Sequence, residues 1–118
     1  MKTHKDLDAW KNGIELVVLI YGLTKSFPKD ELYGLTSQMR RAAISIPSNI
    51  AEGAGRNHDK VFLQFLYIAL GSLAELETQL VITERLNYIP VQELDIPINL
   101  IKLIRSQVSG LVNYVRNK

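Results

Sequence analysis

Apolar residues recur along this chain at alternating spacings of three and four residues, the pattern of helices that bury one side. The pattern predicts four helices, over about residues 7–27, 30–52, 58–87 and 91–117. Almost no segment shows the two-residue alternation of a strand, so the expected fold class is all-α. The predicted core positions, helix by helix, are Leu7, Trp10, Ile14, Val17, Tyr21 and Thr24; Leu32, Leu35, Met39, Ala42, Ile46 and Ile50; Phe62, Leu66, Ala69, Leu73, Leu76, Leu80 and Thr83; and Leu94, Ile98, Ile101, Ile104, Val108, Leu111 and Val115.

The connections between these helices are short and contain typical turn residues. Pro28 ends the first helix, "GAGRN" (53–57) ends the second and "NYIP" (87–90) ends the third. Four helices of similar length joined by short turns favour an up-down-up-down antiparallel four-helix bundle. We expect residues 1–118 to form a single domain of this kind.

Two of the predicted helices carry a second apolar stripe beside the first. It consists of Leu16, Ile20, Leu23 and Phe27 in the first helix, and of Val61, Phe65 and Ile68 in the third. Such a helix must be covered on more than one side, either by a wide core or by another subunit. We expect a homo-oligomer that associates through these second faces.

Composition excludes several kinds of protein. The chain is 47% hydrophobic and 22% charged, which is typical of a globular protein, and it contains no cysteine for a disulfide or thiolate site. The formal charge is only +2, and residues 1–60 hold all of the excess, with nine Lys or Arg against seven Asp or Glu. The longest fully apolar run, residues 16–21, is far shorter than the ~20 residues of a membrane span. We expect a soluble, cytoplasmic protein with no membrane partner.

A polar stripe accompanies the apolar one on the second helix, and it raises the question of a site. Its members are spaced by three and four residues, and a shorter polar row on the third helix faces it. Small residues in both helix centres allow a close approach, so we expect Arg41 to be buried against Glu75 or Glu52. The alternatives are a ligand site and a solvated surface. The members of this expected network are Gln38, Arg41, Ser45, Asn49, Glu52, Ser72 and Glu75.

Two long segments resemble a known family. "YGLTSQMRRAAISIPSNIAEGAGR" (33–56) and "FLYIALGSLAELETQL" (65–80) are similar to the proteins encoded in 23S rRNA intervening sequences, also called S23-like proteins. The accessory variability determinant of diversity-generating retroelements is similar as well. The resemblance implies a four-helix bundle that assembles into a ring-shaped homo-pentamer, and it implies association with RNA or the ribosome. One departure lies in "RNHDKVF" (56–62), where Asn57 is the expected cap of the third helix without a capping box.

Motifs for catalysis are absent from the sequence. The Glu-x-x-His pairs of di-iron bundles, a P-loop and a dinucleotide-binding glycine pattern are all missing, so we expect neither an enzyme nor a cofactor. The remaining hypotheses are two. In the first, a basic oligomer surface binds RNA phosphates; in the second, the protein is an interaction or scaffold module that makes no RNA contact. The candidate nucleic-acid-binding residues are Arg40, Arg56, Lys60 and His58.

Overall fold

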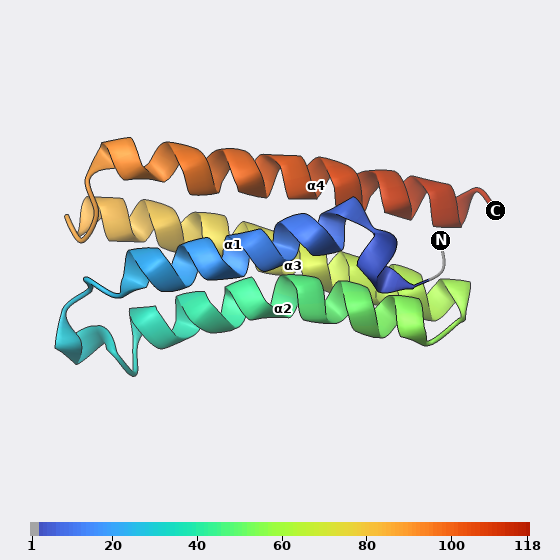
Figure 1. The fold of residues 1–118 in the computed structure, drawn as a ribbon, viewed down its shortest axis with the longest axis horizontal. Helices are drawn as coiled ribbons and strands as arrows, with labels where there is room; N and C mark the ends of the chain where they lie inside the picture. The colour runs from blue at the N-terminus through green and yellow to red at the C-terminus, as the bar shows by residue number, and fades with distance from the viewer. Residues whose placement is uncertain (1–2) are drawn as a thin grey trace.

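Four long helices lie side by side and reverse direction at each connection (Figure 1). They are α1 (Asp8–Thr24), α2 (Leu35–Gly55), α3 (Asp59–Arg85) and α4 (Asp95–Arg116) in a computed structural model that describes residues 3–118. Contacts join α1 to α2, α2 to α3, α3 to α4 and α4 back to α1, so α1 lies diagonally opposite α3. Within residues 3–118 there is no strand. The predicted all-α, up-down-up-down bundle is confirmed.

Three short 3-10 turns precede helices: η1 (His4–Asp6), η2 (Lys29–Glu31) and η3 (Val91–Leu94). Because η2 stops before Gly34, α2 begins about five residues later than the sequence pattern predicts. Glu31, which precedes α2, accepts a hydrogen bond from the backbone N–H of Leu35 at 3.3 Å. Its carboxylate therefore pairs with one of the N–H groups that have no partner within the first turn of α2. Leu32, predicted to be a core residue, lies in this turn and is 50% exposed.

Most predicted core positions of α2, α3 and α4 are buried. All seven positions of α3 are buried, and so are Met39, Ala42, Ile46 and Ile50 of α2. In α4 the buried set includes Ile101, Ile104, Val108 and Val115, with Pro97 tolerated in the first turn because no helical donor is needed there. The helical period therefore located the core of these three helices.

The predicted core face of α1 is only partly right. Thr24 is buried as predicted, and Leu7, Trp10 and Val17 are partly buried against the core. The buried residues are Ala9, Gly13, Leu16, Ile20 and Thr24, whereas Ile14 and Tyr21 are 38% and 36% exposed. Gly13 explains the rotation, because a Cβ atom there would lie only 3.2 Å from Cβ of Pro47. The close approach of α1 to α2 therefore turns the stripe that contains a glycine toward the core.

This rotation also corrects the expected subunit contact. Leu16, Ile20 and Phe27 of the second stripe are buried inside the bundle, so they are unavailable to another subunit. On α3 the outcome differs: Val61 and Phe65 are half-buried, and Ile68 is 50% exposed.

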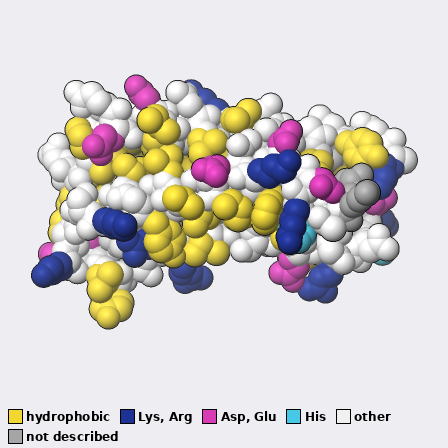
Figure 2. All heavy atoms as spheres, in the orientation of Figure 1, with side chains coloured by type: hydrophobic (Ala, Val, Ile, Leu, Met, Phe, Trp, Pro, Cys, Tyr) yellow, Lys and Arg dark blue, Asp and Glu magenta, His cyan; other side chains and the backbone are white. Residues whose placement is uncertain are grey.

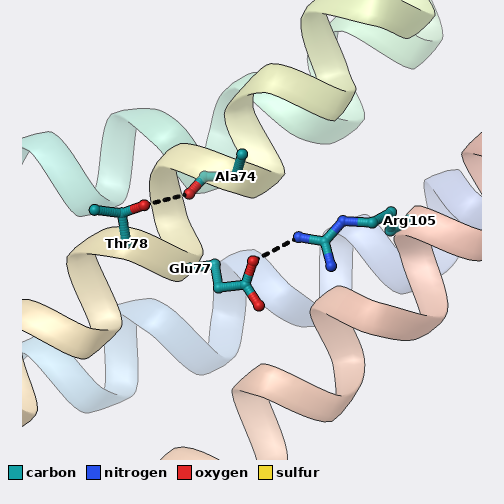
Figure 3. Close-up of polar contacts among 4 residues, drawn as sticks. All are labelled: Ala74, Glu77, Thr78 and Arg105. Carbon is teal, nitrogen blue, oxygen red and sulfur yellow. Dashed lines mark hydrogen bonds and ion pairs between the residues drawn. The ribbon is translucent and has the colours of Figure 1, made fainter.

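An ion pair joins α3 to α4 near their middles. Arg105 Nη2 donates to Glu77 Oε1 at 2.7 Å, and both side chains are about one-third exposed (Figure 3).

By length and composition α3 alone among the described helices is apolar enough to cross a membrane, a test that core helices of soluble proteins also pass. Within α3, 39% of the most apolar 18-residue stretch is buried inside the bundle.

Candidate nucleic-acid interface

Arg56, His58 and Lys60 lie together at the turn between α2 and α3. Arg56 follows the last residue of α2, and its Nη2 donates to Glu52 Oε2 at 2.7 Å while the guanidinium lies 5.7 Å from the Phe65 ring centre. His58 and Lys60 are exposed, and no described residue forms a hydrogen bond or ion pair with either side chain. The side chains of His58 and Lys60 are therefore both accessible to a ligand, and Lys60 is a cation without a carboxylate partner.

The cap of α3 differs from the prediction. His58, rather than Asn57, is the N-cap residue, and its side chain makes no capping hydrogen bond. Asn57 instead has a φ of 55°, the left-handed conformation that asparagine tolerates better than most residues and that reverses the chain here. The first N–H groups of α3 consequently lack a side-chain cap.

Arg40 does not join this group. It lies 16 positions before Arg56 on α2, which corresponds to about 24 Å along a helix. Its Nε donates to Thr24 Oγ1 at 2.9 Å, and its guanidinium carbon lies 4.5 Å from the ring centre of Tyr21. The predicted set of four therefore splits into a turn cluster and one arginine that is held against α1.

Further cations that the sequence reading missed lie at the same end of the bundle. Antiparallel topology brings the starts of α1 and α3 together with the ends of α2 and α4 (Figure 1). The turn cluster is thereby joined by side chains far away in the sequence, a proximity that the predicted up-down order already implied. These additional cations are Lys5, Lys11, Arg116 and Lys118.

Carboxylates are interspersed among these cations. Lys118 Nζ lies 3.3 Å from Asp59 Oδ1, and Arg56 is paired with Glu52 as described above. Within the described chain Lys5, Lys11 and Arg116 form no ion pair. On the face shown in Figure 2, Lys and Arg side chains alternate with Asp and Glu at both ends of the molecule. A single chain therefore presents a mixed-charge surface with a local excess of free cations.

A hollow of about 470 Å³ opens between the ends of α2, α3 and α4. Phe62, Leu111 and Val115 contribute apolar lining, while His58 and Lys118 contribute polar lining. The surface beside the turn cluster is therefore concave. Its volume lies within the range of small-molecule sites.

The polar stripes of α2 and α3 meet only at one point. Ser45 and Ser72 share a hydrogen bond of 2.8 Å between their hydroxyl oxygens, and Ser72 is buried. Asn49 Nδ2 donates to the carbonyl oxygen of Ser45 at 2.7 Å and to its hydroxyl at 2.8 Å. This three-residue network links the helices where small side chains let them approach.

The other members of the expected network lie outside it. Arg41 is exposed rather than buried, and no described residue pairs with it, so the predicted bond to Glu75 or Glu52 is wrong. Glu52 binds Arg56 within its own helix, and Glu75 accepts from Gln79 Nε2 at 3.2 Å within α3. Gln38 is exposed. The guanidinium of Arg41 remains in solvent because burial without a carboxylate is costly.

One groove lies between the two stripes. It is lined by Gln38, Arg41, Ser45, Ser72 and Glu75, so it contains unpaired charges of both signs. Nearby, the Oε1 atom of Gln79 is buried and has no hydrogen-bond partner among the described residues. Residues 3–118 contain no cluster of three His, Cys, Asp or Glu side chains that could hold a metal ion.

Comparisons with known proteins agree on the fold. The family model described as 23S rRNA-intervening sequence protein matches residues 5–110. A crystal structure of a protein of unknown function from the S23 ribosomal protein family of Bacteroides thetaiotaomicron is similar, with a TM-score of 0.78 and 22% identity. That similarity covers 88% of this chain and 97% of the other, and at this identity it shows the fold alone. No curated protein matches the sequence.

Proposed function

The chain belongs to the 23S rRNA-intervening sequence protein family, and from this premise we propose that it is a non-enzymatic, self-associating protein that binds RNA through phosphate groups. The observation that carries the proposal is the group of exposed cations without carboxylate partners at the end of the bundle that contains the α2–α3 turn. Phosphates bind such side chains without sequence preference. The cationic contact residues are Lys5, Lys11, Lys60 and Arg116, with Arg56 shared between Glu52 and the RNA and the imidazole of His58 beside Lys60 as a hydrogen-bonding group.

Self-association makes this weak site effective. One copy carries carboxylates between its cations, so its own affinity for RNA is low. In a homo-oligomer the same cluster is repeated, and the second contact to one RNA strand is intramolecular, which multiplies the apparent affinity. The family resemblance implies a ring of five copies, and hence five copies of the cluster.

Salt dependence tests the RNA contact directly. Binding of a fluorescent single-stranded RNA is measured by anisotropy over a salt series, and the affinity is expected to fall steeply as salt rises. Lys60→Ala should reduce the slope by about one for each copy that contacts the strand, with little change in sequence preference. The matched control is Arg85→Ala, whose side chain is 81% exposed near the opposite end of the bundle.

The result that would contradict the RNA proposal is equally direct. Binding that does not depend on salt, or that survives combined replacement of Lys5, Lys60 and Arg116, removes the proposed contact surface. The same holds if Arg85→Ala lowers the slope as much as Lys60→Ala does.

A second candidate function is a protein-interaction module that makes no RNA contact. The observation that favours it is the apolar surface left exposed on α1 and α2, including Ile14, Val18 and Ile44. Capture from native lysate with and without ribonuclease separates the two. Partners lost after ribonuclease treatment support RNA association, and partners retained support the interaction module.

A further inference from the structure

The groove between α2 and α3 lies at the middle of both helices and has a volume of about 330 Å³. Its lining is almost entirely polar. Ala42 is the apolar residue among the groups that line it, and the others are Gln38, Arg41, Ser45, Ser72 and Glu75. A ligand that covers these side chains must offer them hydrogen bonds, because a covered polar group without a partner is costly.

The two charged side chains of the groove are opposite in sign and are not neutralised. Arg41 and Glu75 are both exposed, and no ion pair joins either of them to a described residue. Their own helices offer no partner, because the one acidic residue of α2 is Glu52, which binds Arg56, and α3 has no lysine or arginine between residues 61 and 84. The α2 side of the groove therefore presents charged donors, and the α3 side presents charged acceptors.

Gln79 orients the carboxylate on the α3 side. Its side chain is only 5% exposed, and its Nε2 donates to Oε2 of Glu75 at 3.2 Å. The other carboxylate oxygen, Oε1, has no partner among the described residues. Because the amide is buried, the carboxylate is held in position before a ligand arrives, and both of its oxygens have lone pairs left to accept from that ligand.

The groove also contains one hydroxyl hydrogen without an acceptor. Ser45 and Ser72 carry two hydroxyl hydrogens, and one of them forms the bond of 2.8 Å between the two oxygens. Asn49 donates to Ser45, which occupies a lone pair of that hydroxyl and not its hydrogen. Neither serine donates to any other described residue, so the remaining hydrogen is available to an acceptor atom that enters the groove.

This arrangement discriminates among ligands. A phosphate would meet the carboxylate of Glu75, and an isolated ammonium group would meet the guanidinium of Arg41, so like charges disfavour both. The groove instead fits a neutral group that places two adjacent acceptors beside two adjacent donors. Guanine has this edge, since its O6 and N7 accept from an arginine and its N1–H and N2–H groups donate to a carboxylate. Cytosine and adenine each offer a single amino group, and uracil offers a single N–H.

We propose that the α2–α3 groove binds a guanine base of the RNA strand whose phosphates contact the turn cluster, with Arg41 donating to O6 and N7 and Glu75 accepting from N1–H and N2–H. The spare serine hydrogen is a further donor to the acceptor edge of the base. The inference rests on the RNA contact of the proposed function and adds a base preference to it.

The open form of the groove favours a base within a strand over a free nucleotide. Because Arg41 and Glu75 are exposed, a free nucleotide would leave much of its surface in water and would gain little affinity. A base in a strand that is already bound at the turn cluster avoids the cost of a second association. Arg41 precedes Arg56 by 15 positions, about 22 Å along a helix, so one strand can contact both.

Modified bases test the two sides of the contact separately. Anisotropy at fixed salt compares a short oligouridine with strands that carry one central guanine, hypoxanthine (which lacks the N2 amino group) or 7-deazaguanine (which lacks N7). The wild-type chain should bind the guanine strand about fivefold more tightly than oligouridine, the lower end of the range for a bidentate base contact. Each modified base should lose part of this preference.

Variants assign each loss to one side chain. Glu75→Gln should bind the guanine and hypoxanthine strands equally, because its carbonyl oxygen stays with Gln79 and its NH₂ group then faces the base. Arg41→Ala should bind the guanine and 7-deazaguanine strands equally. Both variants should keep the salt slope of the wild type, whereas Lys60→Ala should lower the slope and keep the base preference.

The matched control is Glu15→Gln, which should keep both the slope and the preference. Glu15 is an exposed carboxylate of α1 that forms no ion pair within the described chain. Circular dichroism and thermal unfolding confirm that each variant is folded.

The outcomes separate this inference from the proposed function. A wild-type chain that binds no RNA overturns both. Salt-dependent binding that is equal for the guanine and uridine strands overturns the inference alone, and so does a guanine preference that survives both groove substitutions or that Glu15→Gln also removes. Guanosine monophosphate that saturates the groove at micromolar concentration, without a guanine preference among the strands, would assign the groove to a free nucleotide and would also overturn it.

Discussion

Two glycines determine how closely α2 approaches its neighbours. Gly13 of α1 faces Pro47, as described above, and Gly53 near the end of α2 faces α3. A Cβ atom at Gly53 would lie 2.7 Å from Cβ of Phe65 and 3.0 Å from Cδ1 of Phe62. At this scale the fold depends on the absence of a side chain, because a methyl group at either position would separate two helices.

Replacing Gly53 by alanine should therefore destabilise the protein. The expected loss is about 1–3 kcal/mol, the cost of overpacking a core, because Cβ of Phe65 is attached directly to the backbone of α3 and cannot rotate away. Gly110→Ala is the control, since a Cβ atom there meets nothing within 4 Å and alanine favours a helix interior by about 1 kcal/mol. Urea unfolding measures both, and a neutral or stabilising Gly53→Ala would show that α3 shifts without cost.

Tyr88 links the α3–α4 connection to the start of α2 in a pH-dependent way. Its hydroxyl donates to Glu31 Oε2 at 2.7 Å, and this hydrogen bond to a carboxylate raises the pKa of Tyr88 above its ordinary value of about 10. The protonated form is favoured in the fold, so its contribution to stability is complete below pH ~10 and is lost as pH rises through the raised pKa.

The expected result is a stability difference between wild type and Tyr88→Phe that shrinks with pH. Urea unfolding at about pH 8 should show the variant to be less stable, and the difference should shrink as pH rises above about 10 and through the raised pKa of Tyr88. Tyr114→Phe, at a site 67% exposed, should show no such convergence. A stability difference that stays constant across this pH range would mean that the Tyr88 proton does not contribute to the stability of the fold.

Between elements, Arg40 fastens α2 to the end of α1. Thr24 Oγ1 accepts a hydrogen bond from Arg40 and donates one to the carbonyl oxygen of Ile20 at 2.8 Å. The same hydroxyl therefore joins α2 to α1 and pairs with a carbonyl group in the last turn of α1. Stacking on Tyr21 holds the guanidinium plane in place. The sequence alone suggested an RNA contact for this residue, whereas its geometry is that of a helix–helix clamp.

Neighbouring arginines should consequently differ in their effect on stability. Arg40→Ala should cost about 1–2 kcal/mol, and Arg40→Lys should recover little of it because an ammonium group lacks the planar stacking geometry. Arg41→Ala should change the free energy of unfolding by no more than about 0.5 kcal/mol, since Arg41 is exposed and unpaired. Thermal and urea unfolding at low protein concentration measure these differences without a contribution from association. Equal effects at the two positions would contradict the clamp.

At the scale of the whole molecule, the bundle is a rod of 46 × 25 × 19 Å, and on the face shown in Figure 2 apolar side chains are exposed along its middle with charged side chains around them and at both ends. This distribution separates two surfaces, with RNA phosphate contact proposed at one end and self-association along the sides. Substitutions in one surface are thus expected to leave the other intact, apart from the avidity that the oligomer supplies.

Self-association should appear in the unfolding of the wild-type protein. Because association stabilises only the folded state, Tm is expected to rise with protein concentration, and Ile44→Glu, which places a charge on the exposed apolar surface of α1 and α2, should weaken that dependence. Ile96→Glu is the control, since Ile96 is exposed on α4, and it should retain the dependence. A wild-type Tm that is constant over a hundredfold dilution would contradict self-association, whatever the result with RNA.

Helix number, order and most core positions followed from the sequence because they depend on local periodicity. The α3 pattern was sufficient by itself, since its seven predicted core positions repeat without interruption and all of them are buried. The turn cluster of Arg56, His58 and Lys60 was also predictable, because three residues of one turn must lie together. Asn57 as the cap was not, because its left-handed backbone moves the N-cap to the next residue, His58.

Only the tertiary structure decided which stripe of α1 is buried and where the polar groups of α2 point. Periodicity favoured the stripe with Trp10 and Tyr21, but the packing of Gly13 on Pro47 requires the other, and a glycine carries no hydrophobic signal. Likewise the spacing placed Arg41 and Glu75 on facing helices, whereas the hydrogen bond between Ser45 and Ser72 occupies the helix contact and leaves Arg41 outside it. Periodicity within one helix is a local property that the sequence contains; the rotation of that helix against its neighbours depends on side-chain volumes from distant segments that meet only in the folded bundle.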